Sequence, residues 1–222
     1  MSFILLLLTL AVFIVLELVK SSKKRALTQR RAAPGAQVSY TIVERYYHPG
    51  HAWMVVNSPE VVTVGVDDFA QRVLGHLSGV QMPLLGTSVR QGEVYATIER
   101  GGKSLPQIAP LSGIVVDVNN KLVGRPQLVN TSPFDRGWIA KIAPANLSLE
   151  IRNLLHGAVA ERWEEAVRSQ LIQWFSPPLH SVLQDGGRIA ENVSDLMSEQ
   201  EWQRFVQEFF PIAGMIRNNI KN

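Results

Sequence analysis

The sequence contains no cysteine among its 222 residues. That absence excludes disulfide bonds, a cysteine nucleophile, a cysteine-based metal site and an acylated cysteine at the membrane. An excess of one charge is also lacking, since 22 Lys and Arg against 19 Asp and Glu leave a formal net charge of +3. The basic residues cluster in one stretch, so we expect no nucleic-acid partner. No Ser-His-Asp set, phosphate-binding glycine loop or carboxylate pair stands out, and we expect no active site of the chain's own.

Charge is nearly absent from the first nineteen residues. Residues 2–19 read SFILLLLTLAVFIVLELV, with Glu17 as the one charged side chain. Eighteen helical residues reach roughly 27 Å, close to the ~30 Å of a bilayer core. A cleaved signal peptide would need basic residues before the apolar run, and none is there. We therefore predict a single transmembrane helix over residues 1–19, which makes the membrane the first partner.

A basic flank follows this helix. Its residues are Lys20, Lys23, Lys24, Arg25, Arg30 and Arg31. Because short flanks rich in Lys and Arg stay on the cytoplasmic side, we predict a single-pass topology with the C-terminal domain in the cytoplasm. Residues 32–39 are rich in Ala, Pro, Gly and Gln, so residues 20–44 are interpreted as basic flank and linker.

The middle of the chain is β-like. Residues 60–65, 93–99 and 113–118 are rich in β-branched and aromatic side chains and are bounded by Gly, Pro or Asn. Several short strands with short connections predict a compact barrel or sandwich. A helix over residues 67–74 interrupts them, with an acidic pair at its N-terminus and Phe69 and Val73 on one face.

The pattern becomes helical after Pro144, and residues 148–222 are interpreted as a helical C-terminal extension. Ser148 is the expected N-cap of a long amphipathic helix that runs to Trp174. The sequence Ser-Pro-Pro at 176–178 ends it, and two glycines at 186–187 break the next segment. Ser198 and Glu201 form a capping box for a last helix with an aromatic stripe, which we interpret as core packing.

Residues 99–113 read ERGGKSLPQIAPLSG and predict a hairpin with Lys103 near its tip. Adjacent glycines accept the positive φ angles of a two-residue turn, so Gly101 and Gly102 are expected at the tip. Lys103 then begins the returning strand. Pro106 indicates that this strand is irregular or lies at a sheet edge.

Four blocks in this region resemble the H protein of the glycine cleavage system over roughly residues 45–155. They are YHPGHAW (47–53), VGVDDFAQ (64–71) with Leu74-Gly75, APLSG (109–113) with Val118-Asn119, and PQLVN (126–130) with Pro133, Gly137-Trp138 and Ile142-Ala-Pro144. The resemblance implies a lipoyl domain over residues 45–147, a mainly β fold of the flattened lipoyl/biotinyl barrel type (barrel-sandwich hybrid). We expect Trp53 and Trp138 to be buried in it.

The resemblance also implies a carrier and not a catalyst. In the family, a lipoyl group on one lysine shuttles an aminomethyl group between partner enzymes. That lysine lies three residues after a Glu and eight before the Pro of an Ala-Pro pair. Counting from Glu99 or back from Pro110 leads to Gly102, so Lys103 is displaced by one residue.

Two interpretations of Lys103 follow. It could carry lipoate and make the chain a working carrier, or it could be an exposed turn lysine on a fold that has no cofactor and binds protein partners. We prefer the second, because a shift of one residue in a strand redirects the side chain.

Ala52 stands where the family's His-Glu-Trp pattern has Glu, which weakens the case for retained partner surfaces. His48 and His51 are assigned a structural role, since no carboxylate or cysteine lies near them in the sequence. A third interpretation, from another class, is an export-pump adaptor, which also joins one membrane helix to a lipoyl-like barrel.

Overall fold

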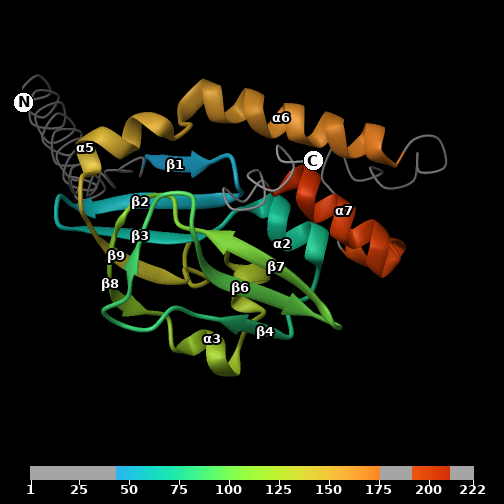
Figure 1. Ribbon diagram of the computed structural model, residues 1–222, viewed down its shortest axis with the longest axis horizontal. Coiled ribbons are helices and arrows are strands. Elements are labelled where there is room, and N and C mark those ends of the chain that lie inside the picture. Colours follow the sequence, from blue (N-terminus) through green and yellow to red (C-terminus); the bar gives the residue numbers. More distant parts are fainter. Residues whose placement is uncertain (1–43, 176–191, 211–222) are drawn as a thin grey trace, which may run out of the picture. The chain divides into compact units, whose positions relative to one another are not determined.

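The computed structural model describes residues 44–175 and 192–210. In these ranges the chain forms two antiparallel sheets with helices around them (Figure 1). The larger sheet has the strand order β1 (Arg45–His48), β2 (Ala52–Ser58), β3 (Val61–Val66), β9 (Ala140–Pro144), β8 (Gly113–Val118) and β5 (Ser88–Val89). The smaller sheet has the order β4 (Gly79–Gln81), β6 (Val94–Arg100) and β7 (Lys103–Ile108). The strands expected at 60–65, 93–99 and 113–118 are confirmed as β3, β6 and β8.

One hydrophobic core joins the two sheets. Side chains from both belong to it and are at most 1% exposed, among them Met54, Val62, Val64, Ile98, Leu105, Val115 and Ile142. Alternate residues of each strand supply these side chains, because successive residues of a strand face opposite sides of the sheet. The mainly β fold expected from the sequence is confirmed.

Helix α2 (Asp68–Leu74) forms where the sequence predicts it, with Asp67 as its N-cap. The Asp67 side chain accepts a hydrogen bond of 2.9 Å from the backbone N–H of Ala70. Phe69 and Val73 are buried on its inner face. The helix ends at Gly75, whose φ of +90° is a conformation that favours glycine. Two short helices, α3 (Lys121–Gly124) and α4 (Leu128–Thr131), lie between β8 and β9.

The long helix predicted to begin after Ser148 begins further along the chain, so its predicted start is wrong. Asn146, and not Ser148, caps a short helix α5 (Leu147–Glu150), and a single 3-10 turn, η1 (Ile151–Asn153), follows. Leu155 then pairs with Tyr47 on edge strand β1 through two backbone hydrogen bonds of 2.8 Å. These bonds hold the chain extended there, so the long helix α6 (Gly157–Trp174) begins only at Gly157 and contacts β1 (Figure 1).

The last described elements are a 3-10 helix, η2 (Val193–Leu196), and α7 (Glu199–Phe209). The capping box is confirmed: the backbone N–H of Glu201 donates to Ser198 Oγ, and the Glu201 carboxylate accepts from the backbone N–H of Ser198. Helix α7 contacts β7, and η2 contacts α2. Residues 192–210 are called the C-terminal segment below.

The two tryptophans of the resembling blocks differ in burial. Trp53 is 2% exposed, as expected. Trp138 is only half-buried, so its expected burial is wrong, and the ammonium of Lys141 lies 4.9 Å from its ring centroid. Its neighbour Ile139 is fully buried instead. Because adjacent side chains of an extended chain face opposite sides, only one of the two can face the core.

Several predictions fall on residues that the structure does not describe. They are the transmembrane helix at 1–19, the linker as far as residue 43, the prolines at 177–178 and the glycines at 186–187. Among residues 44–175 and 192–210, no helix has the length and apolar character needed to cross a membrane.

Candidate functional site

The β6–β7 hairpin has the two-residue tip that the sequence predicts. Gly101 and Gly102 have φ angles of +55° and +84°, and Arg100 pairs directly with Lys103 across the turn. Lys103 is therefore the first residue of β7, which is an edge strand of the smaller sheet. Residues directly opposite one another in an antiparallel pair project from the same face. Arg100 and Lys103 consequently leave the hairpin on one side.

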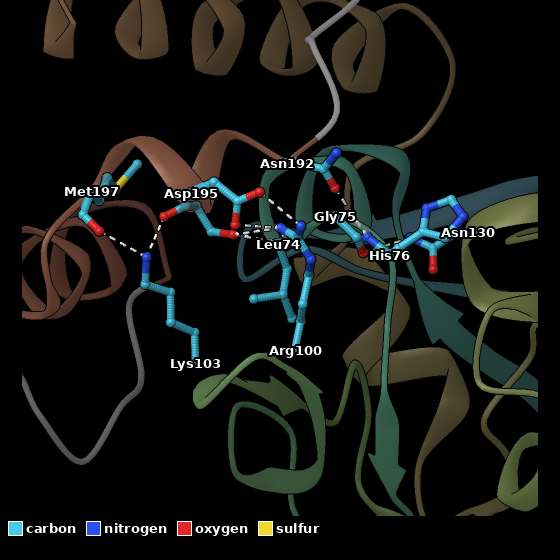
Figure 2. Close-up of polar contacts among 10 residues, drawn as sticks. Leu74, Gly75, His76, Arg100, Lys103, Asn130, Asn192, Asp195 and Met197 are labelled. Carbon is cyan, nitrogen blue, oxygen red and sulfur yellow. Dashed lines mark hydrogen bonds and ion pairs between the residues drawn. The ribbon is translucent and has the colours of Figure 1, made fainter.

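The Lys103 ammonium contacts the C-terminal segment (Figure 2). It donates one hydrogen bond to the carbonyl oxygen of Ser194 and another, of 2.8 Å, to the carbonyl oxygen of Met197. It also lies 5.9 Å from the ring centroid of Trp202, within the range of a cation–π contact. The expectation of an exposed turn lysine is therefore wrong: Lys103 is half-buried, with its amine occupied.

The position of these two carbonyls explains the contact. Ser194 lies within η2 and Met197 is its C-cap, and the Ser194 carbonyl also accepts from the backbone N–H of Met197 at 3.2 Å, so Lys103 adds a second donor at the C-terminal end of η2. A lysine side chain can donate to such carbonyls and also complements the negative end of the helix dipole. Lys103 thus acts as a C-cap of η2, although its strand lies about ninety residues earlier in the chain. The cap is located between η2 and Ser198, the N-cap of α7.

Arg100 makes the second charged contact with the segment. Its guanidinium pairs in a bidentate manner with Asp195, with distances of 2.8 Å and 2.7 Å. Nη1 also donates to the carbonyl oxygen of Leu74 at 3.0 Å and to Ser194 Oγ at 3.2 Å. Ser194 Oγ in turn donates to the same Leu74 carbonyl at 2.8 Å. The end of α2, the hairpin and η2 are therefore joined in one polar network (Figure 2).

The start of the segment contacts the turn that follows α2. Asn192 Oδ1 accepts from the backbone N–H of His76 at 3.3 Å, and the Asn192 backbone N–H donates to the carbonyl oxygen of Arg72. On the other side of this turn, Asn130 Nδ2 donates to the carbonyl oxygen of Gly75 at 2.9 Å. A Cβ at Gly75 would lie 2.1 Å from Asn192 Oδ1, so only glycine permits this approach.

Aromatic packing holds the rest of the segment. Apart from Leu196, which is exposed, its apolar side chains are each at most 6% exposed and belong to the same core as the sheets: Val193, Met197, Trp202, Phe205, Val206, Phe209 and Phe210. Phe205 stacks on Phe209 with 4.3 Å between ring centroids, and both meet the edge of Trp174 at the end of α6. The stripe is core packing, as the sequence analysis expects.

A buried histidine–carboxylate pair lies under the same segment. His51 is 1% exposed, and its Nδ1 is 2.7 Å from Oδ2 of Asp67. Its ring stacks on Phe69 and lies 4.7 Å from Phe210, centroid to centroid. The expectation that no carboxylate accompanies the histidines is wrong. Strand β3 brings Asp67 back beside the turn between β1 and β2, and the backbone N–H of Asp67 donates to the carbonyl oxygen of His51 there. Among the described residues, no group of three or more His, Cys, Asp or Glu side chains could hold a metal.

His48 stays uncharged over a wide pH range. Its Nδ1 accepts a hydrogen bond of 3.0 Å from the backbone N–H of Gly50, which requires that nitrogen to be unprotonated. Burial, and secondly the neighbouring His51, lowers the pKa of His48 from 6.5 to about 4.

On α6, burial raises the pKa of Glu164, and the Asp67 carboxylate adds to this.

With the segment docked, Lys103 does not fit a lipoyl group. An amide at Nζ would leave one N–H where the ammonium has three, and it would remove the positive charge that complements the end of η2. The acyl carbon would also be bonded to the nitrogen that now donates to the carbonyl oxygens of Ser194 and Met197. The sequence points to Lys103 but not to these partners, because nothing local indicates where a C-terminal helix will dock.

Comparison with known proteins gives one consistent family. The family model of the glycine cleavage H-protein matches residues 45–167. The probable glycine cleavage system H protein 1 of Saccharolobus solfataricus is 36% identical over 114 residues, 51% of this chain and 83% of that protein. That of Aeropyrum pernix is 42% identical over 110 residues, 50% of this chain and 74% of the relative. A crystal structure of the Mycobacterium marinum H protein aligns with 29% identity and a TM-score of 0.49, over 56% of this chain and 96% of that one. The C-terminal segment lies beyond the range that the family model matches.

Proposed function

Because the chain belongs to the glycine cleavage H-protein family, whose members are lipoyl carriers without catalytic activity of their own, we propose that it is an interaction module built on the carrier fold. In this module Lys103 is a structural residue and carries no lipoate. Membership of this family favours an interaction module over an export-pump adaptor. The protein partners would be recognised by the surface of the domain and not by a swinging arm.

The occupied amine of Lys103 is the observation that carries this proposal. Both hydrogen bonds from Nζ go to backbone carbonyls of the same chain. A partner protein would have to break them before it could contact the amine. The displacement from the family's spacing supports the same view. Lys103 lies in the paired part of β7, whereas Gly102 occupies the tip, where an added Cβ would meet no atom within 4 Å.

The same proposal includes a membrane anchor. It rests on the apolar run at 2–19, in which Glu17 is the one charged residue, and on the basic flank after it, which together favour a single-pass protein with residues 20–222 on the cytoplasmic side. Anchoring would confine the module to two dimensions and raise its effective concentration near other membrane-bound partners.

Intact-mass measurement of the full chain, purified from its native host, tests the proposal. We expect the mass calculated from the unmodified sequence. The Lys103→Arg variant should differ from it only by the mass change of the substitution. Lys121→Arg, on an exposed lysine of α3, is the matched control. A lipoyl adduct that disappears in Lys103→Arg alone would instead establish the second candidate, a working lipoyl carrier, which family membership supports.

A further inference from the structure

The C-terminal segment occupies the face of the hairpin on which Lys103 and Arg100 lie. It reaches this face from the far end of the chain, outside the range that the family model matches. Its contacts are of two kinds: polar contacts at residues 192–197, around η2, and aromatic contacts along α7. The two kinds hold different parts of the segment, so their contributions can be separated by mutation.

The polar contacts determine where η2 lies relative to the lysine. The Arg100–Asp195 pair is bidentate, with the guanidinium mostly buried, its side chain 21% exposed, and the carboxylate 59% exposed. Asp195 is in the first turn of η2, and the two carbonyls that Lys103 contacts belong to Ser194 and Met197 on either side of it. Loss of the Arg100–Asp195 pair should therefore make the two carbonyl groups that accept from Lys103 Nζ more mobile.

The aromatic contacts keep α7 in place independently of that pair. Trp202 is 1% exposed, and its indole Nε1–H donates to the carbonyl oxygen of Ser104 on the free edge of β7 at 3.3 Å. Phe205 is completely buried. The helix thereby covers an edge strand that would otherwise present unpaired backbone groups to other chains.

From these contacts we propose that the C-terminal segment is an intramolecular cover that keeps the Lys103 amine and the β7 edge from other molecules, with the Arg100–Asp195 pair as the latch at its polar end. The hairpin face that a carrier offers to its partners is thus already occupied by the chain's own residues. This inference deepens the proposed function, on which it rests, by giving the reason why the amine stays unmodified.

Amine reactivity of the full chain in detergent micelles tests the cover. The protein is made in cells that lack lipoate, so that Lys103 begins unmodified, and is treated with the N-hydroxysuccinimide ester of acetic acid, which acetylates free amines. Peptide mass spectrometry then gives the rates at Lys103 and at exposed Lys121. We expect Lys103 to react at least ~10-fold more slowly than Lys121. Equal rates at the two lysines would overturn the cover.

Asp195→Asn tests the latch, because it removes the charge and keeps the shape of the side chain. We expect it to speed acetylation of Lys103 by ~3–10-fold and leave Lys121 unchanged. Glu93→Gln is the matched control, since it removes the carboxylate of the Arg90–Glu93 pair at the other end of β6. Faster hydrogen exchange at residues 193–197, with α7 unchanged, is the second expected readout. Unchanged Lys103 rates in Asp195→Asn would overturn the latch.

These outcomes are distinct from a failure of the proposed function. If protein from the native host carries lipoate on Lys103, the structural role of the lysine fails. The cover then predicts that the modified protein has lost hydrogen-exchange protection at 193–197 relative to the unmodified chain. Equal protection in the two forms would overturn the cover as well.

Discussion

Protonation of the half-buried His48 should destabilise the fold in a pH range that its partial desolvation defines. The imidazole accepts a hydrogen bond from the backbone N–H of Gly50 through Nδ1. A proton on that nitrogen would replace the acceptor by a second donor, and the charge would lie in a poorly solvated site near His51. Stability should therefore fall as the medium becomes acidic enough to charge this ring.

The sign and size follow from linkage. The pKa of His48 falls from 6.5 to about 4 on folding, so between these values the unfolded chain binds more protons than the folded one. Stability thus rises with pH through this window and is lost as pH falls from 6.5 toward 4. Each pKa unit corresponds to ~1.4 kcal/mol, which gives at most ~3 kcal/mol in all and ~2 kcal/mol between about pH 7 and about pH 4.5.

Urea unfolding of protein that lacks residues 1–19 measures this effect. The comparison uses the parent and His48→Asn, in which Oδ1 of the amide offers Gly50 an acceptor without a titrating ring. The loss of unfolding free energy between about pH 7 and about pH 4.5 should be ~2 kcal/mol larger in the parent, while carboxylates cancel in the difference. His76→Asn, on an exposed histidine, is the control and should follow the parent. Equal losses in the parent and His48→Asn would refute the reasoning.

Three further predictions concern the anchor, the core and the hairpin. Deleting residues 1–19 should release the protein from membranes at ordinary salt, as sedimentation would show; salt-resistant membrane association of the deleted form contradicts a single anchor. Trp53→Ala should lower the unfolding free energy by ~3–5 kcal/mol, against ~1 kcal/mol or less for half-exposed Trp138→Ala, in denaturant unfolding; equal losses would contradict the assigned burial. Gly102→Lys, which restores the family's spacing at an open tip, should gain a lipoyl adduct by intact mass in a lipoylating host, at ~1 kcal/mol or more of strain at φ +84°. An unmodified mass in a host that lipoylates its own carriers would contradict the spacing argument.

Local signals in the sequence predict local structure well. Asp67 before an apolar helical pattern, the Ser198–Glu201 pair, and two adjacent glycines each specify their own backbone, and all three elements form as predicted. These signals work because the groups that satisfy each other are at most four residues apart. Ser148 misleads for the same reason, since Asn146 offers an equivalent cap two residues earlier.

Long-range contacts account for what the sequence does not reveal. The break before Gly157 depends on the pairing of Leu155 with Tyr47, more than a hundred residues away in the chain. His51 has no carboxylate near it in the sequence, yet the fold of β3 brings Asp67 to 2.7 Å. Periodicity identifies the buried face of α7 but contains no information about which surface that face will cover.

The one-residue displacement of the lysine and the docking of the C-terminal segment form a single arrangement. At the tip, position 102 has a positive φ, and a Cβ added there would meet no atom within 4 Å, which suits a residue that must reach other proteins. Position 103 is paired with Arg100 in the ladder, so its side chain has a fixed face and a fixed neighbour. That face holds the end of η2, where two backbone carbonyls accept from Lys103 and Asp195 pairs with Arg100. Moving the lysine from 102 to 103 therefore changes a free amine at a turn into an anchor between the barrel and the C-terminal helices, and the chain gains a stabilising contact where the family places a reactive one.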